Sequence, residues 1–384
     1  MTDVYIVDAV RTPAGKLGGS LATTRPDDLA AHVVRALVER NPGVGAIEDV
    51  YFGDANQAGE DNRNVARMAV LLAGLPTSTP GATVNRLCGS GMEATFSASR
   101  AIAAGDASIC LAGGVESMSR APWVLLKPSK PFPRTSETLH STTLGWRMVN
   151  PAMPDEWTVS LGEGAEILAD RYGISREQQD AFALKSHHRA AAAWDRGAFA
   201  DEVVPVPDVD LPRDENIRAD SSLEKLAQLK PVFRKDGTVT AGNSSPMNDG
   251  ASALLLADES DDALARIASR ASSAVEPQLY GIGPVEAANK ALSRAGIGWS
   301  DLVAVELNEA FAAQSLACLA EWPMIDPEIV NVNGGAIALG HALGSSGTRL
   351  LTTLAWELRR RGGGWGLAAM CIGVGQGIAM VIEA

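Results

Sequence analysis

A cysteine at position 88 stands where the sequence changes from strand-like to helix-like. It lies in the segment NRLCGSG (85–91), so a helix is expected to begin within about three residues of it. Backbone N–H groups and the helix dipole at such a position favour the thiolate. The alternative is a buried small hydrophobic residue, which is what we predict for Cys110 and Cys318. We favour a nucleophile at Cys88, because the small residues after it let another molecule approach closely.

Three further segments could supply chemistry. His341 lies in the glycine-rich turn GGAIALGHALG (334–344) and is the natural candidate for a base, because imidazole titrates near neutrality. Cys371 ends a strand and is followed by glycines, which superficially match a dinucleotide loop. Only seven residues remain after Gly377, too few for the helix that such a loop needs. Asn308 follows a strand, and a helix N-cap is its simplest explanation.

Strand-like and helix-like segments alternate along the first third of the chain, which predicts an α/β protein with a largely buried sheet. The same order returns in the last third at a spacing near 255 residues, which favours an internal duplication. A second strand–turn–helix unit is expected there, with its helix starting at Gly347. The expected strands of the first third are 4–10, 50–53, 83–87 and 108–113, and the expected helices are 27–40, 64–73 and 91–104.

Residues 121–242 differ from both repeats and contain ten of the 20 prolines. We predict one strong helix there, at 176–196, and strand-like sequence again at 238–243 and 251–257. The segment is interpreted as a large insertion late in the first half. Insertions of this kind usually carry binding loops over a rigid scaffold.

Composition excludes several classes of function. The 384 residues carry a formal charge of -13, so the mean field of the protein repels nucleic acid and anionic membranes. No apolar stretch approaches the ~18 residues that a membrane span needs. The N-terminus has an acid where a signal peptide has cations, which favours an intracellular protein. The cysteines are far apart, so neither a structural zinc site nor a disulfide framework is expected. Two cysteines and one histidine on glycine-rich turns of a duplicated α/β scaffold instead suggest covalent thiol catalysis.

Together these segments resemble the thiolase family, over almost the whole chain from Val4 to Glu383. The resemblance rests on five blocks in the family's order: NRLCGSG (85–91), GGVESMS (113–119), NEAF (308–311), the turn Gly335–Gly344 and CIG (371–373). It implies two βαβαβαββ halves in a five-layer α-β-α-β-α fold. The halves would be 1–120 with 243–258, and 264–384. Residues 121–242 would be a loop domain that binds CoA and makes oligomer contacts.

The resemblance also implies roles for the residues. Cys88 would be the acylated nucleophile and His341 its base, while Cys371 would move the α-proton of acetyl-CoA. Asn308 would position a water in an oxyanion hole shared with His341. Backbone N–H groups of Cys88 and Gly373 would form a second hole. No metal and no permanently bound cofactor are expected, since coenzyme A is a substrate.

Ser245 matches a family serine that touches pantetheine, and Arg218 stands where relatives bring a basic side chain to the adenine nucleotide. Four departures from the family pattern concern the same site and weaken an assignment to acetoacetyl-CoA. Ala342 replaces the usual Pro after the histidine, Pro246 a usual Gly, Ser160-Leu161 a His-Met, and Tyr280 a Met.

The segment Thr142–Pro151, with Arg120–Pro122, is similar to thiolases that cleave 3-oxoadipyl-CoA. Arg147 could suit a terminal carboxylate, although we favour the alternative that it packs or pairs inside the loop domain. The main hypothesis is a cytoplasmic, degradative 3-oxoacyl-CoA thiolase of fatty acid β-oxidation, a tetramer built as a dimer of dimers, or a dimer. The alternative is a biosynthetic acetyl-CoA C-acetyltransferase. A decarboxylating ketoacyl synthase, a non-catalytic lipid-binding relative and a nicotinamide dehydrogenase fit less well.

Overall fold

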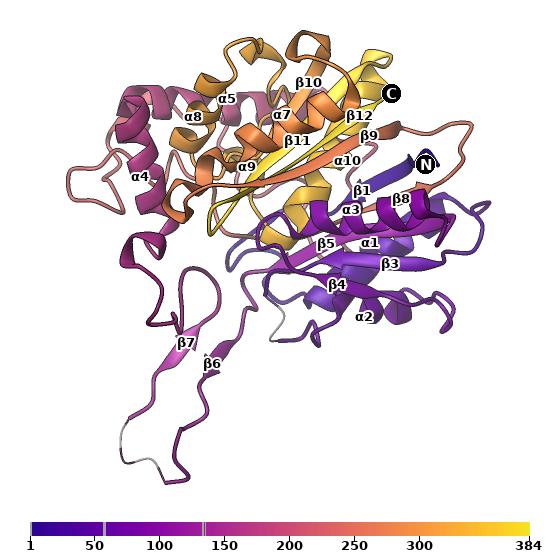
Figure 1. Ribbon diagram of the computed structural model, residues 1–384, viewed down its shortest axis with the longest axis horizontal. Helices are drawn as coiled ribbons and strands as arrows, with labels where there is room; N and C mark the ends of the chain where they lie inside the picture. The colour runs from indigo at the N-terminus through magenta and orange to yellow at the C-terminus, as the bar shows by residue number, and fades with distance from the viewer. Residues whose placement is uncertain (1, 57–58, 133, 135) are drawn as a thin grey trace.

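The computed structural model describes residues 2–56, 59–132, 134 and 136–384 (Figure 1). The strands are β1 (Tyr5–Arg11), β2 (Gly15–Lys16), β3 (Asp49–Gly53), β4 (Ala82–Val84), β5 (Ile109–Ser117), β6 (Trp123–Leu125), β7 (Leu139–Ser141), β8 (Asn248–Ala257), β9 (Ala265–Ala274), β10 (Leu302–Leu307), β11 (Trp365–Ile372) and β12 (Gln376–Glu383). The helices are α1 (Pro26–Arg40), α2 (Val65–Leu72), α3 (Ser90–Ala104), α4 (Leu161–Tyr172), α5 (Arg176–Asp195), α6 (Leu223–Ala227), α7 (Gly283–Ala295), α8 (Ala312–Glu321), α9 (Ala336–Leu339) and α10 (Leu343–Arg361).

The main sheet has the strand order β10-β11-β12-β9-β1-β8-β5-β3-β4, with β2 paired to β8 at the side. It consists of two arms, one from each half of the chain. The arms are joined by a short antiparallel pairing of Tyr5 with Arg266 and of Ile6 with Ala265. In both arms the outer strands are parallel and the last strand returns antiparallel, as in β3-β5-β8 and β10-β11-β12. The internal duplication and the α/β class are therefore confirmed.

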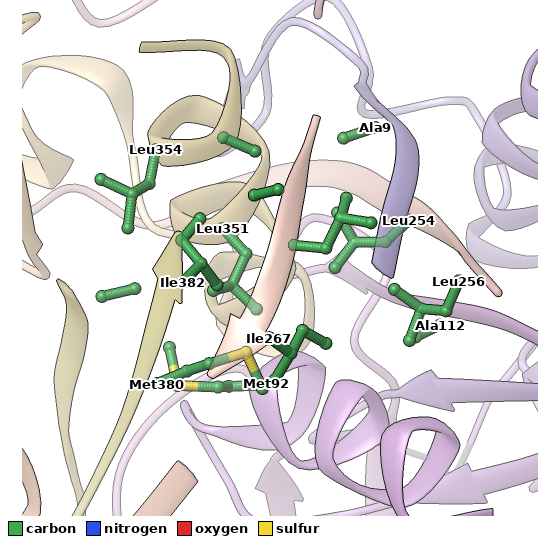
Figure 2. Packing of buried hydrophobic residues seen from close by; sticks show 14 of the residues in the cluster. Ala9, Met92, Ala112, Leu254, Leu256, Ile267, Leu351, Leu354, Met380 and Ile382 are labelled. Carbon is green, nitrogen blue, oxygen red and sulfur yellow. The ribbon is translucent and has the colours of Figure 1, made fainter. Parts of the chain in front are cut away.

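Helices cover the arms in three layers. Helices α1 and α2 cover the outer face of the N-terminal arm, where their apolar residues form a buried cluster with its strands. Helices α7 and α8 cover the outer face of the C-terminal arm in the same way. Helices α3 and α10 lie between the arms, where Met92 and Leu351 pack with Leu254 and Met380 from the two sheets (Figure 2). This is the expected five-layer order. The C-terminal half differs from the expected βαβαβαββ pattern in one place, because one of its strands is reduced to a single bridge between Val305 and Val330.

The two central helices approach each other through glycines. A Cβ on Gly91 of α3 would lie 2.7 Å from the carbonyl oxygen of Gly344 in α10. A Cβ on Gly114 would strike the same carbonyl, and one on Gly347 would strike the backbone of Met92. Helix α10 begins at Leu343, four residues before the expected start, so this glycine contact involves its first turns.

The insertion leaves the body of the molecule in one direction and returns to it. Strands β6 and β7 form a hairpin that projects away from the sheet arms in Figure 1. The rest packs back on the body, where the buried Arg11 pairs with Glu202 and Asp214 of the insertion. The prediction of a strand at 238–243 is wrong, since the segment forms only a single bridge, between Pro231 and Thr240. Within the described ranges, none of the helices has the length and apolar character that crossing a membrane requires.

The glycine contact generates a prediction about stability. Gly114→Ala should lower the free energy of unfolding by about 2 kcal/mol or more, because the added methyl must displace the α10 backbone. Gly43→Ala is the matched control, since a Cβ there meets no atom within 4 Å. Urea unfolding followed by circular dichroism measures both variants. Equal unfolding free energies would show that α10 can shift away from β5 at little cost.

Candidate active site

Cys88 is held in a tight turn between β4 and α3. Leu87, directly before it, has φ of 48°, in the left-handed region that a leucine rarely adopts. The Leu87 N–H donates to Asn85 Oδ1 at 2.8 Å, and the hydroxyl of Ser90 donates to the Leu87 carbonyl at 2.5 Å. These bonds fix the turn on both sides of the strained residue. The sulfur of Cys88 is therefore held at the start of α3 by its own neighbours.

The electrostatic expectation for Cys88 is wrong in sign. Burial and, to a smaller extent, the buried Glu116 carboxyl raise the pKa of its thiol to about 11. A backbone hydrogen bond from Gly373 and one from the Cys88 amide act in the opposite direction, but they are weaker. Because desolvation exceeds the effect of these hydrogen bonds, the resting thiol is protonated and needs a base.

His341 lies in a turn shaped by Gly340, which has φ of 99° and whose Cβ would strike the Asn248 amide. The Asn248 side chain accepts from the His341 N–H at 3.0 Å and donates to the Gly15 carbonyl at 2.7 Å. Ala342 has φ of -77°, close to the value that proline imposes. The backbone shape that a proline would give at this position is therefore kept without one.

The imidazole of His341 is buried and neutral. Its Nδ1 lies 2.7 Å from the hydroxyl of Ser346, which itself donates to the Ala342 carbonyl at 2.8 Å. Since the Ser346 hydroxyl already donates its hydrogen bond to that carbonyl, it can only accept from His341. We therefore assign the ring proton to Nδ1, which leaves Nε2 free to accept. Burial, helped by Arg349, lowers the pKa of His341 to about 4.

The two turns are brought together by the glycine contact between the central helices. Cys88 stands three residues before Gly91, and His341 stands three residues before Gly344. Because a Cβ on Gly91 would touch the Gly344 carbonyl, the first turns of α3 and α10 meet at backbone distance. The predicted nucleophile and the predicted base therefore flank one contact, although they belong to different halves of the chain.

Cys371 lies near the end of β11, close enough to Cys88 for the two thiols to interact electrostatically. It is buried, and burial raises the pKa of its thiol well above the usual value, with Cys88 as the next largest cause. Tyr280 packs with it, and its hydroxyl donates to the Leu161 carbonyl at 2.8 Å. Both cysteines raise the pKa of Tyr280 beyond what burial alone does. The tyrosine that replaces the family methionine thus lies beside both thiols.

Asn308 is fully buried, and neither its side-chain oxygen nor its nitrogen has a hydrogen-bond partner among the described residues. It is not a helix cap, because α8 begins only at Ala312 and its N-cap is Phe311. The N-cap explanation is therefore wrong. A buried amide without partners costs free energy, which is expected where a side chain serves a ligand or a water.

A cavity of about 390 Å³ opens beside Cys88. Cys88, Gly373 and Tyr280 contribute to its wall, together with a loop from Thr142 to Arg147. His341, Asn308, Cys371 and Ser245 are not among its lining residues. The cavity therefore reaches one side of the cysteine turn, while the expected base and the second thiol lie deeper.

The two residues expected to bind CoA lie apart from this wall. The hydroxyl and the N–H of Ser245 both donate to the Ala310 carbonyl at 3.0 Å, which ties it to the segment after Asn308. Arg218 is exposed, and its N–H donates to Nδ1 of His187 at 3.3 Å. Cys110 and Cys318 are buried in β5 and α8, as predicted. Among the residues that the structure describes, no group of three potential metal ligands is found.

Two buried carboxyl groups support the site and were not singled out from the sequence. Glu309 accepts from Ser186 Oγ at 2.6 Å, from Asn331 Nδ2 at 2.8 Å and from the Ile337 N–H at 3.1 Å. It thereby holds the glycine turn that leads to His341.

Glu116 accepts from the N–H groups of Ala55 and Gly344, and burial raises its pKa to about 7. Its presence in the block GGVESMS was the only signal in the sequence.

Comparison with known proteins shows the family of both halves of the chain. The family model of the thiolase N-terminal domain matches residues 4–260, and that of the C-terminal domain matches residues 261–384. A beta-ketoadipyl-CoA thiolase of Pseudomonas aeruginosa is 53% identical, with 99% of each chain covered. The 3-oxoadipyl-CoA/3-oxo-5,6-dehydrosuberyl-CoA thiolase of Escherichia coli is 52% identical, with 100% of each chain covered.

Solved structures give the same result. Human mitochondrial 3-ketoacyl-CoA thiolase in complex with CoA superposes with a TM-score of 0.93 at 39% identity, covering 100% of this chain and 98% of that one. Acetyl-CoA acetyltransferase of Bacillus anthracis gives the same score at 40% identity, covering 100% and 99%. Since family models match both halves and the relatives align over their full length, this chain belongs to the thiolase family of CoA-dependent acyltransferases.

Proposed function

We propose that this thiolase cleaves 3-oxoacyl-CoA with CoA through an acyl group on Cys88, and that 3-oxoadipyl-CoA is its substrate. The observation that supports the mechanism most directly is the Cys88 sulfur itself. It contributes to a cavity wall, receives a hydrogen bond from the Gly373 N–H and interacts with the buried Cys371. The names of the relatives support the substrate. They favour an acyl chain with a terminal carboxylate over the fatty-acyl chains of β-oxidation.

The first step forms a bond between Cys88 and the 3-keto carbon. The Cys88 proton passes to Nε2 of His341, which is neutral and unoccupied at the start. The keto oxygen becomes an oxyanion, which preorganised donors must stabilise. We assign one donor set to a water on Asn308 together with His341, and the other to the N–H groups of Cys88 and Gly373. The partnerless amide of Asn308 supports the first set.

The second step breaks the bond between C2 and C3. The acyl group stays on Cys88, and the enolate of acetyl-CoA takes the proton of Cys371, which becomes a thiolate. An incoming CoA thiol then gives its proton to Cys371 and attacks the thioester, while His341 returns a proton to Cys88. Every group is restored at the end. The same steps in reverse condense two acyl-CoA molecules, which is the biosynthetic alternative.

We also propose that coenzyme A lies along the loop domain, residues 121–242, with Ser245 near pantetheine and Arg218 near the nucleotide. The thiolase halves are 1–120 with 243–258, and 264–384. The two family models, which meet between residues 260 and 261, are compatible with this division. A cytoplasmic location belongs to the same proposal, and it fits the bacterial relatives.

The projecting hairpin supports an assembly of four chains. Trp123 and Leu125 on β6, Leu139 on β7 and Phe132 in the tip are each more than half exposed. Apolar side chains gathered on one projection usually mark a contact with another protein. A second hairpin of the same sequence offers the matching apolar surface, so we propose that hairpins join two dimers.

Replacing Trp123 and Phe132 by Asp should then reduce the assembly from four chains to two, because buried carboxylates would oppose the contact. Light scattering during gel filtration measures the mass. Lys130→Asp, on the same hairpin, is the matched control for added charge without loss of apolar surface. An unchanged mass in the double variant would contradict a tetramer held by the hairpins.

The roles of the two thiols can be separated, because the half-reactions have different needs. Acylation of Cys88 by acetyl-CoA moves no proton at carbon, whereas cleavage of a 3-oxoacyl-CoA does. Cys371→Ser should lower thiolysis by about a hundredfold or more, since a hydroxyl is a far weaker acid than a thiol. Exchange of labelled CoA into acetyl-CoA should fall much less.

Mass spectrometry provides the control for that comparison. Incubation with acetyl-CoA should add one acetyl group to the peptide that holds Cys88, both in the unchanged enzyme and in Cys371→Ser. Label on Cys110, Cys318 or Cys371 alone would rule out Cys88 as the nucleophile. Equal losses of exchange and thiolysis would mean that Cys371 supports the site generally.

The lowered pKa of His341 predicts the pH dependence of acyl exchange. Protonation disables the base, so activity is lost as the pH falls through the histidine pKa. Burial lowers that pKa from 6.5 to about 4, and kcat/KM should therefore stay nearly constant from pH 7.5 down to about 5. Exchange rates at each pH, with circular dichroism to confirm folding, test this. An acid limb centred near 6.5 would show a solvated imidazole.

A further inference from the structure

The cavity wall beside Cys88 carries two charged side chains among its lining residues, Glu116 and Arg147. They differ in how they are satisfied. Glu116 is buried, and its Oε2 accepts from the N–H groups of Ala55 and Gly344 at 3.1 and 2.9 Å. Arg147 is exposed and makes no hydrogen bond or ion pair with any residue that the structure describes. The preferred explanation from the sequence, that Arg147 packs or pairs inside the loop domain, is therefore wrong, because the side chain is exposed and has no described partner.

The loop that carries Arg147 is anchored at two points before the cation, at Thr142 and at Trp146. The indole N–H of Trp146 donates to the Val159 carbonyl at 3.1 Å. At the start of the loop, Asn56 Nδ2 donates to Thr142 Oγ1 at 2.8 Å, and Thr142 Oγ1 donates to the Pro122 carbonyl at 2.6 Å. Arg147 therefore directly follows an anchored residue of the wall, and it has no partner among the residues that the structure describes.

The rest of the wall around Arg147 is mainly apolar. Leu144 and Trp146 precede it, and Trp157 and Leu161 contribute from the segment that follows the loop. Such a surface suits the methylene groups of an acyl chain. A carboxylate brought into it without a cation would lose its hydration and gain nothing in return. A guanidinium offers two parallel N–H donors that match a carboxylate.

We propose that Arg147 binds the terminal carboxylate of the acyl chain and makes this thiolase selective for 3-oxo dicarboxylic acyl-CoA substrates. The inference rests on the proposed thiolysis at Cys88, whose sulfur lies on the same cavity wall. Glu116 does not compete for the guanidinium, because backbone N–H groups already occupy its carboxylate. Arg147 is thus a residue of substrate recognition, with no part in bond making or breaking.

The test compares two substrates of equal length, 3-oxoadipyl-CoA and 3-oxohexanoyl-CoA, which ends in a methyl group. The unchanged enzyme should favour 3-oxoadipyl-CoA in kcat/KM by at least about tenfold. Arg147→Ala should lower kcat/KM for 3-oxoadipyl-CoA by about 10- to 100-fold, mainly through KM, and change it for 3-oxohexanoyl-CoA by less than about twofold. Arg147→Lys should retain part of the preference, since it keeps the charge without the paired donors.

Arg171→Ala is the matched control. Arg171 is an exposed arginine of the same domain without a described ion pair, and it lies about 15 Å along α4 from Leu161. It should change neither rate. A loss in Arg147→Ala that is equal for the two substrates would overturn the proposal and assign Arg147 a structural role.

A retained preference in Arg147→Ala would show that another group binds the carboxylate. If the unchanged enzyme cleaves both substrates equally well, the proposed thiolysis is supported and the proposed carboxylate site is contradicted. If it cleaves neither, the proposed function falls as well, and the inference with it.

Discussion

The site depends on one close contact, where the first turns of α3 and α10 meet without side chains between them. Gly91 and Gly347 allow the two backbones to touch. The carbonyl of Gly344 lies against both Gly91 and Gly114 of β5. Cys88 stands three residues before Gly91, and His341 stands three residues before Gly344. The separation between Cys88 and His341 is therefore set by backbone packing, which is stiffer than any side-chain contact. The duplicated scaffold supplies two equivalent helix starts, and the glycines bring them to one place.

Burial at this contact produces a site that is uncharged at rest. Desolvation raises the pKa of both thiols and lowers that of the imidazole. The charges that a reaction creates must then be met by groups already oriented, such as backbone N–H groups and the amide of Asn308. The two buried carboxyl groups nearby have raised pKa values and are held by other donors. Glu309 is held by three donors and Glu116 by two, so neither is free to move toward the reacting atoms.

The sequence was informative where chemistry coincides with the end of a strand. Cys371 lies near the end of β11 and Cys88 lies four residues after the end of β4, and a period of about 255 residues relates the two halves, so their elements could be predicted. Quantities that depend on distant packing could not. The pKa of Cys88 is raised and not lowered, because burial by the folded chain is its largest cause, and two smaller influences, the charge of Glu116 and the hydrogen bond from Gly373, come from residues far away in the sequence. The partners that hold His341, Asn248 and Ser346, have no local pattern at all.

Local signals also misled where two structures share one sequence pattern. An asparagine before Glu and apolar residues is typical of an N-cap, but at Asn308 three more residues precede the helix. Residues 238–243 have strand-like composition, yet without a neighbouring strand they form only one bridge.

Strand β8 has a consequence for how the chain folds during synthesis. All ten of its residues are buried, and it lies between β1 and β5 in the N-terminal arm. It follows the whole insertion in the chain, so β1 and β5 leave the ribosome long before their common partner exists. Until then both present unpaired edges, which are prone to aggregate. The insertion therefore delays closure of the first half by its own length, and only the second half can close as a contiguous segment.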